Sequence, residues 1–158
     1  MVPVYLATSK GSTNHTVHIS LSTIVSDGNS SQTRKKEYRA VLDTGAAPVI
    51  VRRAALPEGV RIHQLDEPPL LVDAQRKALS IAGVVKAVIQ MGRGAYRVAA
   101  LVAYDMSVDV ILGTQFVESP VQLINARRRS VTMDGGDEVS LVDAQYRVAE
   151  RAIVTDRV

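Results

Sequence analysis

The chain contains no cysteine and no tryptophan, and its aromatic residues are five tyrosines and one phenylalanine. The lack of cysteine excludes disulfide bonds, thiol catalysis and cysteine-ligated zinc. The lack of aromatics predicts an aliphatic core built mainly from valine, alanine, leucine and isoleucine. No two of the histidines His15, His18 and His63 have the i, i+4 spacing of a helical metal site. We therefore expect neither a metal ion nor a cofactor.

Long apolar runs and a strong charge imbalance are also missing. No apolar run approaches the length of a membrane span, and residues 1–5 lack the features of a signal peptide. We expect no membrane partner and an intracellular location. The net charge is only +3, and with so few aromatics it predicts no nucleic-acid partner. The run of Arg127, Arg128 and Arg129 could bind phosphate, but a solvated strand edge is the preferred interpretation.

Most of the chain has the pattern of β-strands in a single all-β domain. Alternating or β-branched segments predict strands at residues 17–25, 38–42, 49–51, 70–72, 78–81, 84–91, 96–103, 108–112, 121–124 and 130–133. Residues 70–81 and 84–103 are each expected to form a hairpin. The polar stretch at residues 26–36 is predicted to be a long exposed loop.

The C-terminal residues have a different pattern. Asp134, Gly135, Gly136 and Asp137 interrupt the strands, which places the end of the β-domain at residue 134. Ser140 and Asp143 together resemble a helix capping box, which predicts a helix over residues 140–154. Residues 135–158 are therefore expected to form a short helical tail, either a linker or an assembly element.

The segment most informative about chemistry is residues 40–46, Ala-Val-Leu-Asp-Thr-Gly-Ala. An aliphatic strand here leads Asp43 into a tight turn, where a buried carboxylate needs backbone donors to offset its desolvation. Gly45 would let the backbone approach closely. An ordinary β-turn with aspartate at its first position is the alternative interpretation, and the tripeptide alone does not distinguish the two.

A second segment, Asp-Val-Ile-Leu-Gly at residues 109–113, follows after the two predicted hairpins. In this order, the two motifs resemble those of the retroviral-type aspartic proteases, the retropepsins. The sequence Ile-Leu-Gly-Thr-Gln-Phe-Val is most similar to proteases of gypsy-class LTR retrotransposons. The resemblance covers residues 1–134 and implies a closed β-barrel lobe with a flap hairpin.

The resemblance also implies roles for individual residues. Asp43 would be the catalytic carboxylate, supported in its loop by Thr44, Gly45 and Ala46. Ile111, Leu112 and Gly113 would form the structural motif that packs beside this loop. The residues implied to bind substrate come from the catalytic loop, the flap and the strand near residue 110: Ala47, Val72, Asp73, Ala74, Gln75, Val108 and Ile111.

The chain has one Asp-Thr-Gly motif, whereas pepsin-like enzymes carry two such motifs in one long chain. The resemblance therefore implies a homodimeric aspartic endopeptidase with a peptide or polyprotein substrate. It implies processing of a retroelement polyprotein, in the cytoplasm or in a retroelement particle. Two alternatives stay open: a non-catalytic peptide-binding or dimerisation domain of the same fold, and an unrelated β-barrel interaction domain.

Some positions depart from the family pattern. Ala47 and Pro48 stand where retroviral enzymes carry acidic residues that bind the substrate main chain. The expected flap tip contains Gln75, Arg76 and Lys77 in place of glycines, and Gln115 replaces the usual Asp or Asn. These differences leave the mode of substrate binding open, and the tail leaves the mode of dimerisation open.

Overall fold

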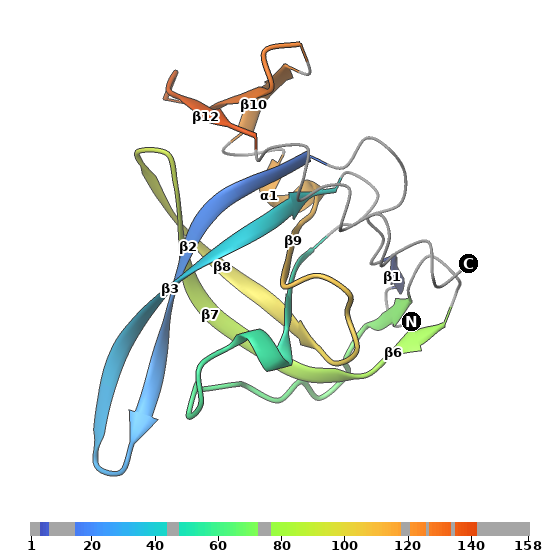
Figure 1. Cartoon of the computed structure of the whole chain (residues 1–158). Helices are drawn as coiled ribbons and strands as arrows, with labels where there is room; N and C mark the ends of the chain where they lie inside the picture. Colours follow the sequence, from blue (N-terminus) through green and yellow to red (C-terminus); the bar gives the residue numbers. More distant parts are fainter. Residues whose placement is uncertain are drawn as a thin grey trace.

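The computed structural model describes residues 4–6, 15–43, 48–72, 77–117, 121–125, 127–133 and 135–141. Within these ranges, the elements are almost all strands, as predicted (Figure 1). In chain order they are β1 (Val4–Leu6), β2 (His15–Asp27), β3 (Ser30–Leu42), β4 (Val49–Arg52), the 3₁₀ turn η1 (Arg53–Ala55), β5 (Leu70–Val72), β6 (Ala78–Leu79), β7 (Ile81–Met91), β8 (Gly94–Ala103), β9 (Val110–Leu112), the short helix α1 (Thr114–Val117), β10 (Val121–Asn125), β11 (Ser130–Met133) and β12 (Glu138–Ser140).

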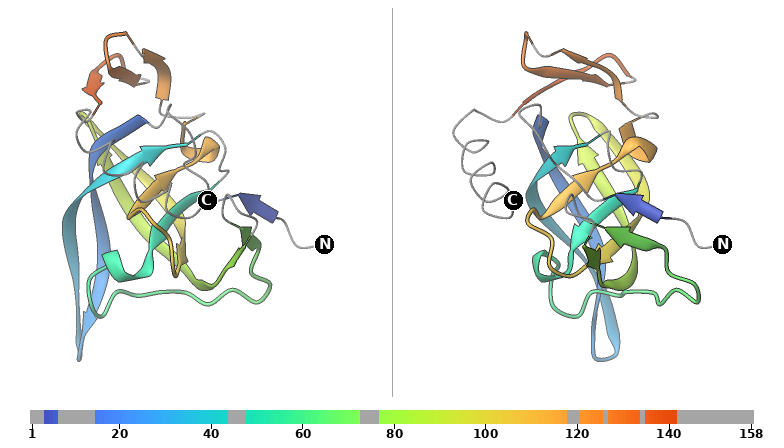
Figure 2. Two further views of the ribbon diagram at one scale, coloured as in Figure 1. Left: turned by 45° about the vertical axis from the view of Figure 1, so that its right-hand side comes forward. Right: turned by 90° about the vertical axis from the view of Figure 1, so that its right-hand side faces the viewer.

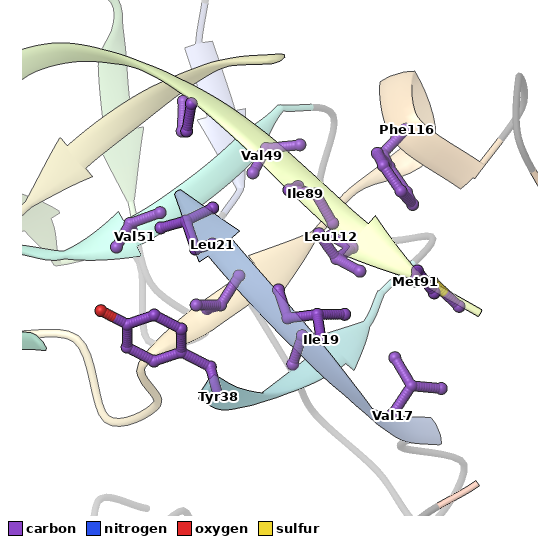
Figure 3. Packing of buried hydrophobic residues seen from close by; sticks show 14 of the residues in the cluster. Val17, Ile19, Leu21, Tyr38, Val49, Val51, Ile89, Met91, Leu112 and Phe116 are labelled. Atoms are coloured by element: carbon purple, nitrogen blue, oxygen red, sulfur yellow. The ribbon is translucent and has the colours of Figure 1, made fainter. Parts of the chain in front are cut away.

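Six of the strands close into a barrel in the order β2-β3-β9-β4-β8-β7. The β3–β9 and β4–β8 pairs are parallel, and the β2–β3, β2–β7, β4–β9 and β7–β8 pairs are antiparallel. Aliphatic side chains from alternate positions fill its interior, as expected for a strand with one inward face. Figure 3 shows Val17, Ile19, Leu21, Val49, Val51, Ile89, Met91 and Leu112 pointing toward one another in this core. The predicted aliphatic core is thereby confirmed.

A second cluster of buried side chains lies on the other face of the same strands. Val41 and Ile111 alternate with the inward residues of β3 and β9, so their side chains point away from the barrel interior. They pack with Leu71 of β5 and Leu79 of β6. The predicted hairpin at residues 70–81 is present as β5 and β6, and its base packs against the barrel through this cluster.

Two small three-stranded sheets flank the barrel (Figure 2). In one, β1 adds to β5 in parallel, a pairing that the sequence pattern does not indicate. In the other, β10, β11 and β12 form an antiparallel meander. Asp137, in the turn before β12, accepts a 3.0 Å hydrogen bond from the backbone N–H of Arg93 in the β7–β8 turn. This contact joins the meander to the end of the barrel, together with the burial of Val131, Met133 and Leu141 in the main core.

The predicted loop at residues 26–36 is wrong. β2 and β3 pair without interruption from His15 opposite Leu42 to Asp27 opposite Ser30, and a tight turn at Gly28 and Asn29 joins them. All eight residues at positions 30–37 are exposed. A strand without a buried face has no apolar alternation, so its polar sequence is easily interpreted as a loop.

The predicted helix start at Ser140 is also wrong. Ser140 ends β12, where it pairs with Ser130, and Leu141 bridges to Val17 with its N–H donating to the carbonyl of Arg129 at 2.8 Å. Pairing with β11 and burial of Leu141 in the main core outweigh the local capping pattern. Residues 142–154 of the predicted helix lie outside the described residues.

Candidate functional site

Asp43 lies directly after the last residue of β3. Its backbone N–H donates a 3.0 Å hydrogen bond to the carbonyl of Leu112, the last residue of β9. The residue is partly buried, and its carboxylate atom Oδ2 is removed from contact with solvent. The aspartate is therefore held by two adjacent parallel strands at the point where both end.

Strand β9 lies between the two strands that flank the 43–48 connection. It runs parallel to β3 through Ile111 opposite Val41, and antiparallel to β4 through Ile111 opposite Ile50. The N–H of Gly113 donates to the carbonyl of Pro48 at 3.1 Å. Ile111, Leu112 and Gly113 are all buried, which the aliphatic, β-branched sequence favours in a strand covered on both faces. This strand consequently fixes both ends of the connection that begins with Asp43.

Several residues of the implied site lie outside the described residues. These are Thr44, Gly45, Ala46 and Ala47 of the catalytic loop, and Asp73, Ala74 and Gln75 of the flap tip. Their roles stay predictions.

Three other implied substrate-binding residues are placed by the structure. Val72 is partly buried in β5, opposite Ala78 of β6. Val108 and Ile111 are 4% and 3% exposed and belong to the second cluster, together with Leu71. In the single chain their side chains therefore pack against neighbours, and their part in substrate binding stays a prediction.

The second cluster links the implied flap to the strand that carries Asp43. Leu71 and Leu79 come from the base of the hairpin, and Val41 precedes Asp43 by two residues. Leu71 is fully buried and Leu79 is 8% exposed. The base of the hairpin is accordingly anchored to the strands around the aspartate by apolar packing.

An ion pair that the sequence did not indicate joins β4 to the start of β9. The guanidinium of Arg52 contacts the carboxylate of Asp109, and the N–H of Arg52 donates to the carbonyl of Asp109 at 2.8 Å. Both side chains are more than a third exposed, so the ion pair contributes little to stability. Asp109 is therefore engaged by Arg52 through both its side chain and its backbone, which gives it a structural role.

Tyr38 fastens the strand that carries Asp43 to the 3₁₀ turn η1. Its hydroxyl donates a 2.6 Å hydrogen bond to the carbonyl of Ala55, which also accepts a 3.2 Å bond from Nζ of Lys36. Burial raises the pKa of Tyr38 from 10.0 to about 12, and the negative charge of Asp109 contributes in the same direction. The hydroxyl is therefore a neutral hydrogen-bond donor at physiological pH.

The described residues contain no candidate for a metal site or for a membrane-spanning helix. No group of three or more His, Asp or Glu side chains gathers there in a way that could hold a metal ion. No helix within the same residues has the length and apolar character needed to cross a membrane.

The structure resembles a solved structure described as the retroviral protease-like domain of Ddi1 from Leishmania major. The TM-score is 0.54 and the sequence identity 15%, over 78% of this chain and 94% of the other. No family model and no curated protein sequence matches the chain. At this identity the likeness concerns the fold alone, and it confirms that the chain has a retropepsin-like fold.

Proposed function

We propose that the chain is an aspartic endopeptidase that acts as a homodimer, with one Asp43 from each subunit forming the catalytic pair. The observation that carries the proposal is the position of Asp43. It opens an Asp-Thr-Gly segment at the end of β3, held against β9, within a retropepsin-like barrel. One chain supplies one such carboxylate from one such segment, so a pair requires a second copy.

The chemistry of the pair follows from the proximity of two carboxyl groups. Two carboxylates that share a site resist simultaneous ionisation, so one proton is shared between them. The ionised Asp43 takes a proton from a bound water, and the oxygen of that water attacks the carbonyl carbon of the scissile peptide. The protonated Asp43 gives its proton to the carbonyl oxygen, which yields a gem-diol. The first Asp43, now protonated, then gives its proton to the amide nitrogen while its partner takes a proton from a diol hydroxyl, so the C–N bond breaks and a carboxylic acid and an amine are released. Activity is expected on the acidic side of neutrality, because loss of the shared proton removes the general acid.

We further propose a substrate class and a setting for the enzyme. The segment Ile-Leu-Gly-Thr-Gln-Phe-Val, at residues 111–117, supports a role in processing the polyprotein of a retroelement. Such an enzyme would act in the cytoplasm or in a retroelement particle.

A second candidate function is a non-catalytic domain of the same fold that binds peptides or dimerises. One feature favours it: Ala47 and Pro48 provide no acidic side chain to hold a substrate main chain after the Asp-Thr-Gly segment. The intact Asp43 favours the enzyme, because a binding domain has no use for a pair of carboxylates that costs free energy to bring together.

The test is hydrolysis of an unfolded protein at acidic pH, with and without a statine-type inhibitor. Asp43→Asn should abolish hydrolysis while leaving the circular dichroism spectrum unchanged, because asparagine can act neither as general base nor as general acid. Asp105→Asn is the matched control: Asp105 is exposed and has a φ of 60°, a conformation that asparagine adopts readily.

Full activity of a folded Asp43→Asn protein would exclude the aspartic-protease mechanism. A wild-type protein that forms a dimer, binds peptides and hydrolyses none of them would favour the second candidate.

A further inference from the structure

One edge of the β2–β3 hairpin has no strand partner over most of its length. β3 pairs with β2 along all of its residues, but β9 pairs with its other edge only over Ala40–Leu42. Between Ser30 and Arg39, no other strand of the described part of the chain pairs with this edge. We call residues 22–37 the ribbon. β7 pairs with β2 as far as Thr23, and beyond that residue β2 and β3 project from the barrel as two strands (Figures 1 and 2).

The half of the ribbon that belongs to β3 is open to solvent. Every residue from Ser30 to Glu37 is exposed, so neither face of this half of β3 is covered. Ile24, on the neighbouring part of β2, is 41% exposed. An exposed strand edge offers a row of backbone donors and acceptors to which an extended segment of another chain can add as a further strand.

The side chains of this edge are mainly cationic. Arg34, Lys35 and Lys36 are consecutive, and alternation places Lys35 on the opposite face from the other two. Nζ of Lys36 is bonded to the carbonyl of Ala55. Within the described residues, the side chains of Arg34 and Lys35 have neither a hydrogen-bond partner nor an ion-pair partner, so their charges are available to a ligand.

A fourth cation adds to this charge at the open end of the ribbon. The guanidinium of Arg61 lies within hydrogen-bond distance of the hydroxyls of Ser26 and Ser31, at 3.4 and 3.2 Å. Against these four cations, the ribbon and the loop beside it contain three acidic residues, Asp27, Glu37 and Glu58. Cations therefore outnumber acids along the ribbon and the loop beside it.

This charge pattern decides between the possible occupants. A second copy of the chain would place lysine and arginine opposite lysine and arginine, which is unfavourable, and lysines on an edge strand generally oppose self-pairing. Single-stranded nucleic acid binds on aromatic platforms, but the one aromatic residue of β2 and β3 is the buried Tyr38. An extended acidic peptide satisfies both the backbone groups and the charges.

We infer that the Ser30–Arg39 edge of β3 is a docking site for an extended acidic peptide segment, which adds to the ribbon as a third strand. The site is distinct from the proposed active site, because Arg34 and Asp43 are separated by nine positions of extended chain, about 30 Å. Binding should therefore be the same in the wild-type protein and in Asp43→Asn.

The probe is a fluorescein-labelled peptide of about ten residues in which glutamate alternates with valine or threonine, a length matched to the free edge. Binding is measured by fluorescence anisotropy on the full chain. Two further peptides of the same sequence carry N-methyl groups on alternate amides. One is methylated at the odd-numbered residues and the other at the even-numbered residues, so that in each peptide the methyl groups lie along one edge of the strand. N-methylation in the phase that faces β3 should weaken binding at least about tenfold without changing the charge.

Variants of the protein test the contribution of charge. Arg34→Glu with Lys35→Glu should weaken binding about tenfold, because two attractions become repulsions of similar size. Lys86→Glu makes the same type of change at an exposed position of β7 and should alter binding less than about twofold. Lys35→Gln is a milder second variant in case the double change impairs folding.

Amide hydrogen exchange locates the peptide on the protein. The peptide should slow exchange within residues 30–39 and leave residues 81–103 unchanged. Equal affinity for the N-methylated peptides, or unchanged exchange at residues 30–39, would overturn the inference. Tighter binding of a single-stranded RNA oligonucleotide that is lost in the double variant would assign the ribbon to nucleic acid instead.

Discussion

Replacing Tyr38 with phenylalanine should have an effect on stability that changes sign with pH. The tyrosine is 5% exposed and its hydroxyl donates a 2.6 Å hydrogen bond to the carbonyl of Ala55. In the variant this carbonyl keeps its 3.2 Å bond from Lys36. At neutral pH we therefore expect Tyr38→Phe to lower the free energy of unfolding by about 1 kcal/mol, the net contribution of one hydrogen bond.

At alkaline pH the variant should become more stable than the wild-type protein. Folding raises the pKa of Tyr38 from 10.0 to about 12. The contribution of its hydroxyl to the free energy of unfolding is therefore complete below pH 10 and is lost as the pH rises toward 12. Each unit of pKa difference corresponds to about 1.4 kcal/mol, so the wild-type protein should lose about 2–3 kcal/mol relative to the variant. The two stabilities should become equal near pH 11, and the variant should be the more stable above that pH.

The measurement is urea unfolding followed by far-ultraviolet circular dichroism at several pH values between about 7 and 12. All other titrating groups occur in both proteins, so their contributions cancel in the difference. Tyr104→Phe is the control, because Tyr104 is 44% exposed and its replacement removes no buried hydroxyl, so the difference at neutral pH should be small. A difference between wild type and Tyr38→Phe that stays constant over the whole range would refute the reasoning.

Three further predictions concern the start of β7, where the register with β8 shifts between Ile81 and Gly83, the C-terminal meander and the proposed dimer. Gly83 has a φ of +148° and an added Cβ would lie 2.3 Å from the carbonyl oxygen of His63, so Gly83→Ala should cost at least about 2 kcal/mol in urea unfolding. Gly28→Ala, with no atom near its Cβ, should cost only about 1 kcal/mol. Leu141→Ala should lower the free energy of unfolding by about 2–3 kcal/mol, because Leu141 is buried. Leu70→Ala, at an exposed position, should change it by no more than about 0.5 kcal/mol. Equal effects of the two substitutions would show that the meander is not part of the folded core. Specific proteolytic activity should fall on dilution together with the dimer seen by sedimentation, and a fully active monomer would contradict the proposed pair.

Most strands of the barrel could be predicted from the sequence because burial of one or both faces leaves a periodic or continuous apolar pattern. The outer half of β3 is the exception: residues 30–37 are all exposed, so they lack this pattern and are easily interpreted as a loop. β4 and β9 are examples: both are short, aliphatic and rich in β-branched residues, and both are buried in the structure. The hairpins at residues 70–81 and 84–103 could also be predicted, because a polar or glycine-containing turn separates two apolar segments in each.

The other elements that could not be predicted depend on contacts between distant residues. β12 forms because Glu138 to Ser140 pair with β11, whereas the local pattern at Ser140 favours a helix start. β1 forms through its parallel pairing with β5, more than sixty positions away. The ion pair of Arg52 with Asp109 depends in the same way on the antiparallel register of β4 and β9. No short stretch of sequence contains these pairings.

The two halves of β3 explain how one strand can carry two independent sites. Residues 38–42 are held on both edges near Asp43, by β2 throughout and by β9 from Ala40 onward, and Tyr38 fastens the start of this half to Ala55. Residues 30–37 are held on one edge only and are exposed on both faces. Local opening is easiest where few contacts must be broken, so the ribbon can rearrange around a ligand while the half that positions Asp43 stays fixed. Substitutions in the ribbon should therefore change peptide docking without moving the aspartate, and substitutions at Tyr38, where the two halves meet, are the ones that should affect both.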